Sequence, residues 1–458
     1  MSPATLDRSL RPEAQCPQLA SSANQGIFME WITIDNIAQH EGQTVELRGW
    51  IANRRSSGKI RFVQLRDGHG AIQCVVMADR VPQEAFDLAD RVPYESSVIV
   101  WGEVKKDPRS PVGFEITTND IKLVSEAAEY PISKKDHGVG FLMDNRHLWL
   151  RSSRQTALLK IRSVITHAAR AFFDEQGFVS VEAPILTPTA CEGTTSLFEV
   201  GYFDRSAYLT QSGQLYGEAA AMALGKIYVY GPTFRAEKSK TRRHLTEFWM
   251  IEPEMAFWEL PETIELAEAL VCRIVHEVLE KCTQQLLTLE RDRTALEKTV
   301  SPFPRITYSE AVEILKDHGT VFNWGDDFGA DEEAVLSQAF DRPVFVTHYP
   351  ADIKAFYMKR DGGDPRLALA VDLLAPEGYG EIIGGGQRED SLDKLEERIT
   401  AHGLDREPLE WYLDLRRYGS VPHAGFGLGI ERVITWIAGI HHVREAIAFP
   451  RLMDRLYP

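Results

Sequence analysis

The chain has 458 residues, of which 44% are hydrophobic and 26% charged, as in an ordinary globular protein of about two or three domains. The formal net charge of −16 argues against indiscriminate binding to nucleic acid, although such binding depends on local basic patches. The five cysteines are widely spaced and form no Cys-x-x-Cys pair, which argues against a disulfide framework or a zinc site and fits a cytoplasmic location. No apolar run reaches the length of a membrane span, so no membrane association is expected.

The first 28 residues differ in composition from the rest of the chain. Residues 1–28 are rich in Ser, Pro, Ala and Gln, and they show neither hydrophobic periodicity nor the apolar core of a signal peptide. We therefore predict a disordered tail, with folded structure beginning near Met29.

Residues 29–127 carry short stretches that alternate hydrophobic and polar residues between turn signals, as β-strands do. Two of these stretches flank Gly68-His69-Gly70 and are expected to pair as a hairpin. The strands are expected at residues 44–51, 61–67, 71–76, 97–102 and 113–116. About five strands in roughly a hundred residues predict a small barrel such as an OB-fold, a common oligonucleotide binder.

The remainder of the chain mixes helical and strand patterns. Residues 128–150 are predicted to be a linker, and residues 151–458 a second domain. Apolar spacing predicts helices at residues 154–176 and 264–286, and Gly177 is expected to end the first. Strands joined by hairpin-like returns, with helices elsewhere, predict an α+β domain with a central antiparallel sheet flanked by helices.

A basic loop between two predicted strands is the clearest chemical signal. Residues 229–252 read as strand, loop and strand, and the loop holds Lys238, Lys240, Arg242, Arg243 and His244. A charge run is usually a solvated hairpin tip. That interpretation does not explain Arg235 and Glu237, which lie where the strand enters a core. An arginine on a strand is a good bidentate phosphate ligand, so polyphosphate or nucleic acid would suit this loop.

Two further stretches are less specific by themselves. Residues 425–434 form a glycine-rich strand that enters a helix, but they do not meet the dinucleotide pattern GxGxxG, and close strand–helix packing would also explain them. Residues 177–187 follow the long helix at 154–176 and read as a strand with an edge proline. The chain has no GxxxxGK[ST] sequence, which excludes a P-loop as a nucleotide site.

In chain order, residues 177–187, 229–252 and 425–434 closely resemble motifs 1, 2 and 3 of the class II aminoacyl-tRNA synthetases. An N-terminal OB-fold is typical of the aspartyl, asparaginyl and lysyl subgroup, and the resemblance covers the chain from about Met29 to Pro458. It implies ATP and Mg²⁺ as substrate and cofactor and a tRNA as partner. It also implies a homodimer, because motif 1 builds a two-fold interface in this class.

The resemblance gives the nucleotide site its residues. Arg235 resembles the arginine that holds the ATP α-phosphate, where a guanidinium stabilises charge in the transition state. Phe248 and Arg432 resemble the pair that sandwiches adenine, and Glu237 and His244 resemble further ATP contacts. The predicted catalytic residues are Arg235, Arg432 and Glu381.

Asp372 and Glu381 are the predicted Mg²⁺ ligands, since the family has acids at both places and Mg²⁺ prefers carboxylates and substrate phosphates. The alternative is a pair of surface acids. Their spacing of nine residues is longer than in aspartyl relatives, which makes Asp372 the less secure of the two.

Residues 211–218 resemble the segment that binds the amino acid. Aspartyl relatives place a lysine at the position of Gly217, whereas this chain has no lysine there and continues with Glu218. An amide offers both an acceptor and a donor, so Arg388 would donate to the carbonyl of asparagine and Glu218 would accept from its NH₂. Glu218 would also repel aspartate. The alternative for Glu218 is a helix position that faces solvent. The other predicted contacts are Glu192, Ser212 and Gln214.

Three barrel residues resemble the family's anticodon readers. Phe62 would stack on a base, Gln73 would read a base edge, and Glu115 is a third candidate. A basic cluster accompanies Phe62: Arg54, Arg55, Lys59 and Arg61. The alternatives are a barrel-core position for Phe62 and an exposed polar strand position for Gln73.

The predicted reaction is the activation of asparagine by ATP and its transfer to the terminal ribose of tRNA(Asn). The first alternative is an aspartyl enzyme, such as one that charges more than one tRNA. The second is a tRNA-independent asparagine synthetase on the same catalytic fold.

Overall fold

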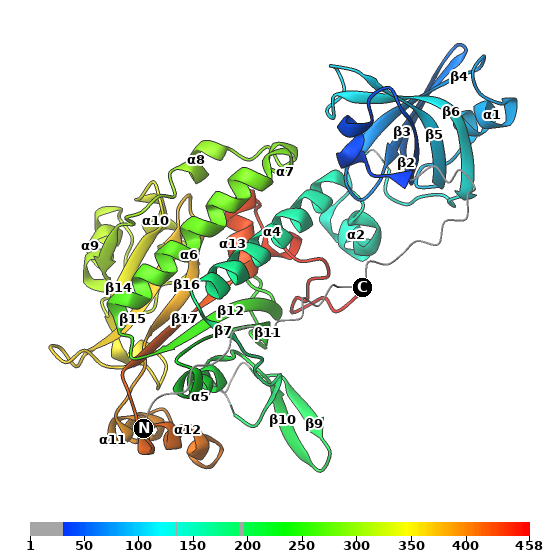
Figure 1. Cartoon of the computed structure of the whole chain (residues 1–458). Coiled ribbons are helices and arrows are strands. Elements are labelled where there is room, and N and C mark those ends of the chain that lie inside the picture. Colours follow the sequence, from blue (N-terminus) through cyan, green and yellow to red (C-terminus); the bar gives the residue numbers. More distant parts are fainter. Residues whose placement is uncertain (1–30, 134, 190, 192–196) are drawn as a thin grey trace, which may run out of the picture. The chain divides into compact units, whose positions relative to one another are not determined.

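The computed structural model describes residues 31–133, 135–189, 191 and 197–458 (Figure 1). The chain divides into two compact units, Met1–Asp136 and His137–Pro458. The boundary lies within the predicted linker, residues 128–150, which also contains α2 (Val139–Asp144) and α3 (Arg146–Trp149). In the described part of the chain, no helix combines the length and apolar character needed to cross a membrane.

The first unit is a closed barrel. Its strands follow the order β1-β2-β3-β4-β6-β5, and β2 also pairs with β5, which closes the sheet on itself. The elements are β1 (Trp31–Ile32), η1 (Ile34–His40), β2 (Thr44–Ser57), β3 (Ile60–Arg66), β4 (Ala71–Met77), α1 (Gln83–Arg91), β5 (Ser97–Lys106) and β6 (Phe114–Ser125). The predicted OB-fold is confirmed, and the strand expected at 44–51 continues to Ser57.

Strand alternation decides which barrel residues face outward. Val63 and Leu65 on β3 are fully buried, as are Cys74 and Val76 on β4. Neighbouring residues on a strand point to opposite faces. Phe62 on β3 and Gln73 on β4 therefore lie on the outer face, which rules out the barrel-core alternative for Phe62.

The second unit contains an eight-stranded sheet with the order β13-β14-β15-β16-β17-β12-β11-β7. The strands are β7 (Val179–Ser180), β11 (Lys226–Phe234), β12 (Glu247–Ala256), β13 (Arg305–Thr307), β14 (Val344–Pro350), β15 (Leu367–Ala375), β16 (Gly380–Gln387) and β17 (His423–Gly429). The six central strands are antiparallel, as predicted, but β7 and β13 pair in parallel with β11 and β14. The sheet is therefore mixed, because both outer strands arrive by longer connections than a hairpin.

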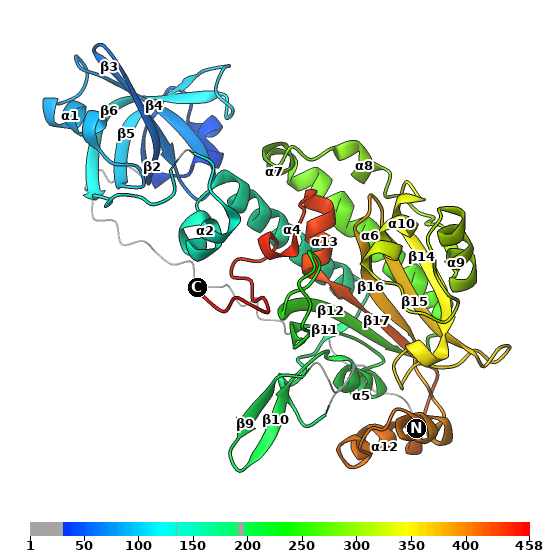
Figure 2. The same ribbon diagram turned by 180° about the vertical axis from the view of Figure 1, so that it is seen from behind.

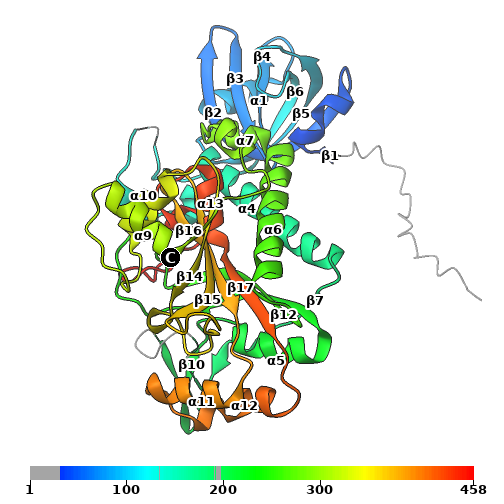
Figure 3. The same cartoon turned by 90° about the vertical axis from the view of Figure 1, so that its left-hand side faces the viewer.

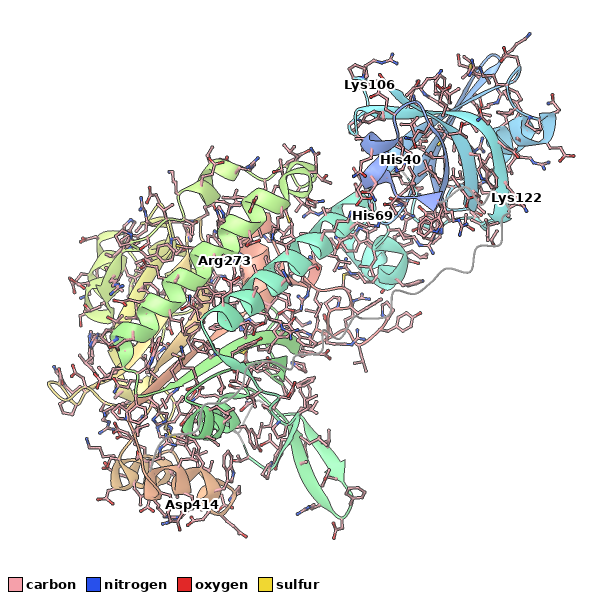
Figure 4. All side chains as sticks on the ribbon, viewed as in Figure 1. His40, His69, Lys106, Lys122, Arg273 and Asp414 are labelled. Carbon is pink, nitrogen blue, oxygen red and sulfur yellow. The ribbon has the colours of Figure 1, made fainter. Side chains whose placement is uncertain are left out.

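Two long helices, α4 (Ser153–Glu175) and α6 (Leu260–Lys281), cover one face of this sheet, together with α13 (Ile430–Ala438) (Figure 3). Ser152 caps α4 by accepting from the Gln155 N–H. Helix α6 begins at Leu260, four residues before the predicted start, after a capping box at Glu259, and a separate helix α7 (Thr283–Thr288) follows it. Arg273, labelled on α6 in Figure 4, pairs with Glu175 at the end of α4.

The remaining elements surround the sheet, and α5 (Gln214–Leu224) packs against β11 and β12 (Figure 2). Helices α8 (Arg293–Glu297), α9 (Tyr308–Asp317) and α10 (Ala330–Gln338) lie between β12 and β15 in sequence, and α10 packs beside β16. The others are β8 (Leu186–Thr187), β9 (Glu199–Tyr202), β10 (Arg205–Leu209), η3 (Ala351–Ile353), α11 (Leu392–Ala401), η4 (Glu407–Leu409), α12 (Glu410–Arg417) and η5 (Val443–Glu445).

Candidate active site

Two adjoining clefts open on the face of the sheet opposite α4 and α6. Strand β12 shows the division between the faces, because Ile251 and Met255 pack in the core beneath these helices, whereas Met250, Glu252 and Glu254 line a cleft. The first cleft encloses about 700 Å³ and the second about 930 Å³. Both are bordered by Arg235, Met250, Glu381 and Gly427.

Predicted nucleotide-site residues gather around the first cleft, and we call it the nucleotide cleft. It is lined by Arg235, Glu237, Arg243, His244, Leu245, Phe248, Met250, Glu381, Ile382, Gly427, Gly429, Glu431, Arg432 and Val443. The guanidinium of Arg235 lies 5.4 Å from the ring centre of Phe248. Its buried Nε has no hydrogen-bond partner among the described residues. An unpaired buried donor is costly, so an acceptor such as a phosphate oxygen would satisfy this atom.

Arg432 and Glu381 form an ion pair across the nucleotide cleft. Arg432 Nη1 lies 2.7 Å from Glu381 Oε2 and 3.2 Å from the Glu381 carbonyl. Burial disfavours the charge of Glu381, but the cations Arg432, Lys354 and Arg235 together lower the pKa of this carboxyl. The fold therefore brings together three predicted catalytic groups: Arg235 directly after β11, Glu381 on β16 and Arg432 on α13.

The basic loop is fixed at its base by contacts that we did not predict. Arg243 Nη1 lies 2.8 Å from Glu333 Oε2 on α10, and its Nη2 donates to the Gly378 carbonyl at 2.7 Å. The same Glu333 oxygen accepts the Glu381 N–H at 2.9 Å. Burial and the nearby Glu381 raise the pKa of Glu333 to about 7.

His244 lies 3.4 Å from Glu237, so the two predicted ATP contacts are neighbours. Burial and the charge of Arg432 lower the pKa of His244 below its ordinary value of 6.5. The imidazole is therefore neutral near pH 7, and it can donate one hydrogen bond and accept another.

An Arg–Glu pair forms one wall of the second cleft, which we call the amino-acid cleft. Arg388 Nη2 lies 2.5 Å from Glu254 Oε1, and the two side chains are only 2% and 1% exposed. Burial raises the pKa of Glu254 to about 7, against the pull of Arg388. Burial also opposes the charge of Arg388, but Glu254 together with Glu218 and Tyr357 raises the pKa of the guanidinium.

Glycines on the neighbouring elements leave room for Glu254. Gly425 lies opposite it on β17, and a Cβ there would overlap the Glu254 carboxyl. A Cβ at Gly217 would lie 3.3 Å from Glu254 Cγ, tighter than most such contacts. The glycine-rich stretch of residues 425–429 thus has a steric role at the amino-acid cleft, in addition to close packing.

Ser212 and Gln214, two of the predicted amino-acid contacts, both line the amino-acid cleft beside Glu252. The Glu252 carboxylate accepts a hydrogen bond from the Ser212 hydroxyl. It accepts another from the Gly213 N–H at 2.9 Å. The polar side chains of Ser212, Gln214 and Glu252, which are suited to bind an ammonium ion, therefore lie together in the amino-acid cleft. Glu192, another of the five predicted contacts, lies outside the described residues.

Glu218 does not line the amino-acid cleft, which contradicts its predicted contact with the substrate. Its carboxylate is completely buried and is bonded to the following groups: Tyr412 Oη at 2.7 Å, Arg416 Nη2 at 2.8 Å, His423 Nε2 at 2.9 Å and Gln214 Nε2 at 3.0 Å. Burial opposes its charge, but Arg416 and His423 together lower its pKa. The solvent-facing alternative is wrong as well, because α5 packs this side chain against α12.

The predicted metal ligands converge over Gly384. An ideal Cβ at Gly384 would lie 2.8 Å from Glu381 Oε1 and 3.4 Å from Asp372 Oδ1. Lys354 Nζ lies 2.9 Å from the other Asp372 oxygen, Oδ2. No group of three or more His, Cys, Asp or Glu side chains suited to a metal occurs among the described residues. The two carboxylates therefore fit a Mg²⁺ ion that takes its other ligands from phosphate and water.

The three predicted anticodon residues lie side by side on the barrel. Gln73 faces Glu115 across β4 and β6, and Gln73 Nε2 donates to Glu115 Oε2 at 3.2 Å. The guanidinium of Arg55 lies 4.1 Å from the ring centre of Phe62 and 3.5 Å from Gln73 Oε1. These four residues form a polar, aromatic patch, which we call the β3–β4 patch.

Half of the predicted basic cluster turns away from the β3–β4 patch. Arg61 pairs with Asp90 at 2.7 Å and lies over Phe86, and Arg54 donates to the Asp90 carbonyl. Both arginines therefore anchor α1 to the barrel.

The residues that we missed include two acids on the buried strand β12 and three charged residues elsewhere in the second unit. Glu252 and Glu254 are two residues apart on β12 and so face the same side, a pattern that was readable in the sequence. Arg243, Glu333 and Lys354 carried no comparable signal, because their partners are distant in the chain.

Comparison with known proteins agrees with this geometry. A family model described as tRNA synthetases class II (D, K and N) matches residues 139–453, and a model described as an OB-fold nucleic acid binding domain matches residues 45–124. The chain belongs to the class II tRNA synthetases of the D, K and N group.

Individual proteins resemble this chain over almost its whole length. An asparagine–tRNA ligase of Symbiobacterium thermophilum is 55% identical over 437 residues, covering 94% of this chain and 100% of the relative. The crystal structure of asparaginyl-tRNA synthetase from Pyrococcus horikoshii complexed with asparaginyl-adenylate is 47% identical, with a TM-score of 0.91 over 94% of this chain and 100% of that one. Aspartyl tRNA synthetase from Entamoeba histolytica is 27% identical, with a TM-score of 0.81 over 100% of both chains.

Proposed function

We propose that this chain is an asparagine–tRNA ligase. It activates asparagine with ATP to give asparaginyl-adenylate and pyrophosphate, and it then transfers the asparaginyl group to the terminal ribose of tRNA(Asn). The relatives at 55% identity carry this activity in their names, and the similar structure from Pyrococcus horikoshii contains asparaginyl-adenylate.

The Arg388–Glu254 pair is the observation that carries the choice of amino acid. Arg388 donates to the side-chain carbonyl of asparagine, and Glu254 accepts from its NH₂ group. Aspartate would bring a second carboxylate against Glu254, which repels it. Glu254 therefore takes the role that the sequence pattern had assigned to Glu218, and Gly217 provides the space for it.

Ser212, Gln214 and Glu252 bind the α-amino group of asparagine in this proposal. The carboxylate of Glu252 supplies the negative charge, and its bonds to Ser212 and Gly213 hold it in place. A fixed amino group orients the α-carboxylate of asparagine for attack on the ATP α-phosphate.

Arg235 binds that α-phosphate, which its unpaired Nε and its place between the two clefts support. Attack of the α-carboxylate increases the charge on the phosphoryl oxygens, and the guanidinium stabilises it. Phe248 and Arg432 bind the adenine ring from either side, and Glu237 and His244 complete the nucleotide site. No covalent bond to the protein is needed.

Mg²⁺ is part of the proposal, with Asp372 and Glu381 as its ligands. When bound, it neutralises charge on the ATP phosphates. Glu381 holds Arg432 with Oε2 and leaves Oε1 toward the ion, so one carboxylate positions both charges.

The proposed tRNA contacts lie on two surfaces, one in each unit. On the barrel, Phe62 stacks on an anticodon base, while Gln73 and Glu115 bind base edges. On the second unit, Lys238, Lys240 and Arg242 of the basic loop contact the acceptor end.

The homodimer is proposed from the outer side of α4 and the edge strand β7. An open groove runs along α4, lined by Leu159, Arg162, Ser163, Thr166, His167, Arg170, Ala171 and Asp174. The neighbouring apolar residues Val179, Ile185 and Leu186 are each 44% exposed. A second copy of the chain would cover both.

ATP–pyrophosphate exchange tests the amino acid directly. We expect exchange with asparagine and at least a hundredfold less with aspartate, followed by charging of tRNA(Asn). Arg235→Ala should reduce exchange by about 10²–10³-fold. Arg273→Ala, which removes an arginine from an ion pair on α6 outside both clefts, serves as the control. Exchange with aspartate alone would identify an aspartyl enzyme, and asparagine activation without tRNA charging would favour the tRNA-independent alternative.

A further inference from the structure

Lys354 is a half-buried cation in the amino-acid cleft that the reaction described above does not use. It follows η3, and its ammonium lies 2.9 Å from Asp372 Oδ2 and 3.7 Å from the ring centre of Tyr349. The Lys354 and Asp372 side chains are only 17% and 15% exposed. The aromatic ring beneath the ammonium holds it over the carboxylate and limits its movement toward solvent.

Each proposed metal ligand therefore already has a cation of the protein beside it. Lys354 pairs with Oδ2 of Asp372, and Arg432 pairs with Oε2 of Glu381. The opposite oxygens, Oδ1 and Oε1, are those nearest to Gly384. A divalent ion between them meets two carboxylates whose charge is largely offset, so its attraction to the protein alone is small.

We propose that Lys354 is a positioning residue that prevents the Asp372–Glu381 pair from binding a divalent ion before ATP arrives. The ion then enters with the ATP phosphates, whose oxygens supply the missing negative charge and ligands. Lys354 also turns Oδ1 of Asp372 toward the ion by holding Oδ2. The inference rests on the proposed function, since it assigns the ion to the ATP phosphates.

Mn²⁺ binding to the full-length chain without nucleotide tests this role. The free Mn²⁺ signal in electron paramagnetic resonance gives the dissociation constant for the wild type and for Lys354→Met. We expect Lys354→Met to bind Mn²⁺ at least tenfold more tightly, because Asp372 then has no counterion. In Lys354→Met with Asp372→Asn, the gain should disappear.

Lys359→Met is the matched control. Lys359 pairs with Asp390 at 2.6 Å and is similarly half-buried, but neither residue lines the two clefts. It should leave Mn²⁺ affinity unchanged. Lys354→Gln provides a second neutral variant, and thermal unfolding establishes that each variant is folded.

Equal Mn²⁺ affinity in the wild type, Lys354→Met and Lys354→Gln would overturn the inference, as would tighter binding that persists without Asp372. ATP–pyrophosphate exchange of the wild type with asparagine, measured in parallel, reports on the proposed function. Absent exchange with the expected Mn²⁺ result would refute the function alone, whereas normal exchange with unchanged Mn²⁺ affinity would refute only the role of Lys354.

Discussion

Two glutamates in the second unit show how much the pKa of a buried carboxyl depends on the charged groups around it. Glu254 and Glu218 are both buried, yet the pKa of Glu254 is raised and that of Glu218 is lowered. Glu218 has Arg416 and His423 against it, whereas Glu254 has Arg388 on one side and carboxylates nearby. Glu218 is therefore a structural anion, and Glu254 is poised to titrate in the amino-acid cleft.

The affinity for asparagine should depend on pH through Glu254. Since burial raises its pKa from 4.5 to about 7, the carboxyl is protonated below pH 7 and becomes an anionic acceptor above it. We expect the KM for asparagine in the exchange assay to fall as the pH rises from 6 to 8. Glu254→Gln should remove this dependence. A KM that stays constant in the wild type would show that Glu254 does not bind the amide.

Glu218→Gln should act mainly on stability. It removes the carboxylate that pairs with the buried Arg416, which costs about 3–5 kcal/mol in the free energy of unfolding. Urea unfolding measures this loss. The control is Glu313→Gln, since Glu313 forms an exposed pair with Lys316 and should change stability by less than about 0.5 kcal/mol. Unaltered stability of Glu218→Gln would place Glu218 outside the folding core.

At the scale of elements, strands position many of the proposed binding side chains, and helices pack against these strands. Strand β12 places Met250, Glu252 and Glu254 on one face and core residues on the other. On the barrel, the pairing of β3, β4 and β6 brings Phe62, Gln73 and Glu115 together. Strand periodicity was readable in the sequence, so both arrangements were partly predictable.

The β3–β4 patch should matter for tRNA and not for adenylate formation. Phe62→Ala removes a stacking surface worth about 1–3 kcal/mol for one base, so kcat/KM for tRNA should fall by roughly 5- to 150-fold. ATP–pyrophosphate exchange should be unchanged. Val124→Ala, at an exposed position on β6, is the comparison variant. Normal charging by Phe62→Ala would remove Phe62 from the tRNA contacts.

For the whole molecule, the division into two units separates the two tasks of the proposed enzyme. The barrel has its own closed core, and the second unit has its sheet and helices. Activation needs only residues of the second unit, whereas charging also needs the barrel. The proposed pairing of two chains concerns α4, whose inner side carries the core and whose outer side borders an open groove.

Substitution on the outer side of α4 tests the homodimer. Ser163→Arg adds a charge to a groove that already holds Arg162 and Arg170, and two-fold symmetry would double the repulsion. Light scattering after size-exclusion chromatography should show a dimer for the wild type and a monomer for this variant. His276→Arg, on the exposed side of α6, should stay dimeric. A wild-type chain of monomer mass would exclude the proposed dimer.

The barrel, the α+β second unit, the family and six residues of the nucleotide cleft (Arg235, Glu237, His244, Phe248, Glu381 and Arg432) were predictable from the sequence, because strand periodicity and local motifs carry that information. The tertiary structure decided which acid meets the amino acid and which cation meets Asp372. Glu254 and Arg388 are 134 residues apart, and Glu218 and Arg416 are 198 apart. Periodicity in the sequence cannot predict pairs of residues so distant in the chain, because they meet only where separate strands and helices pack together. The charge state of each buried group depends on that meeting.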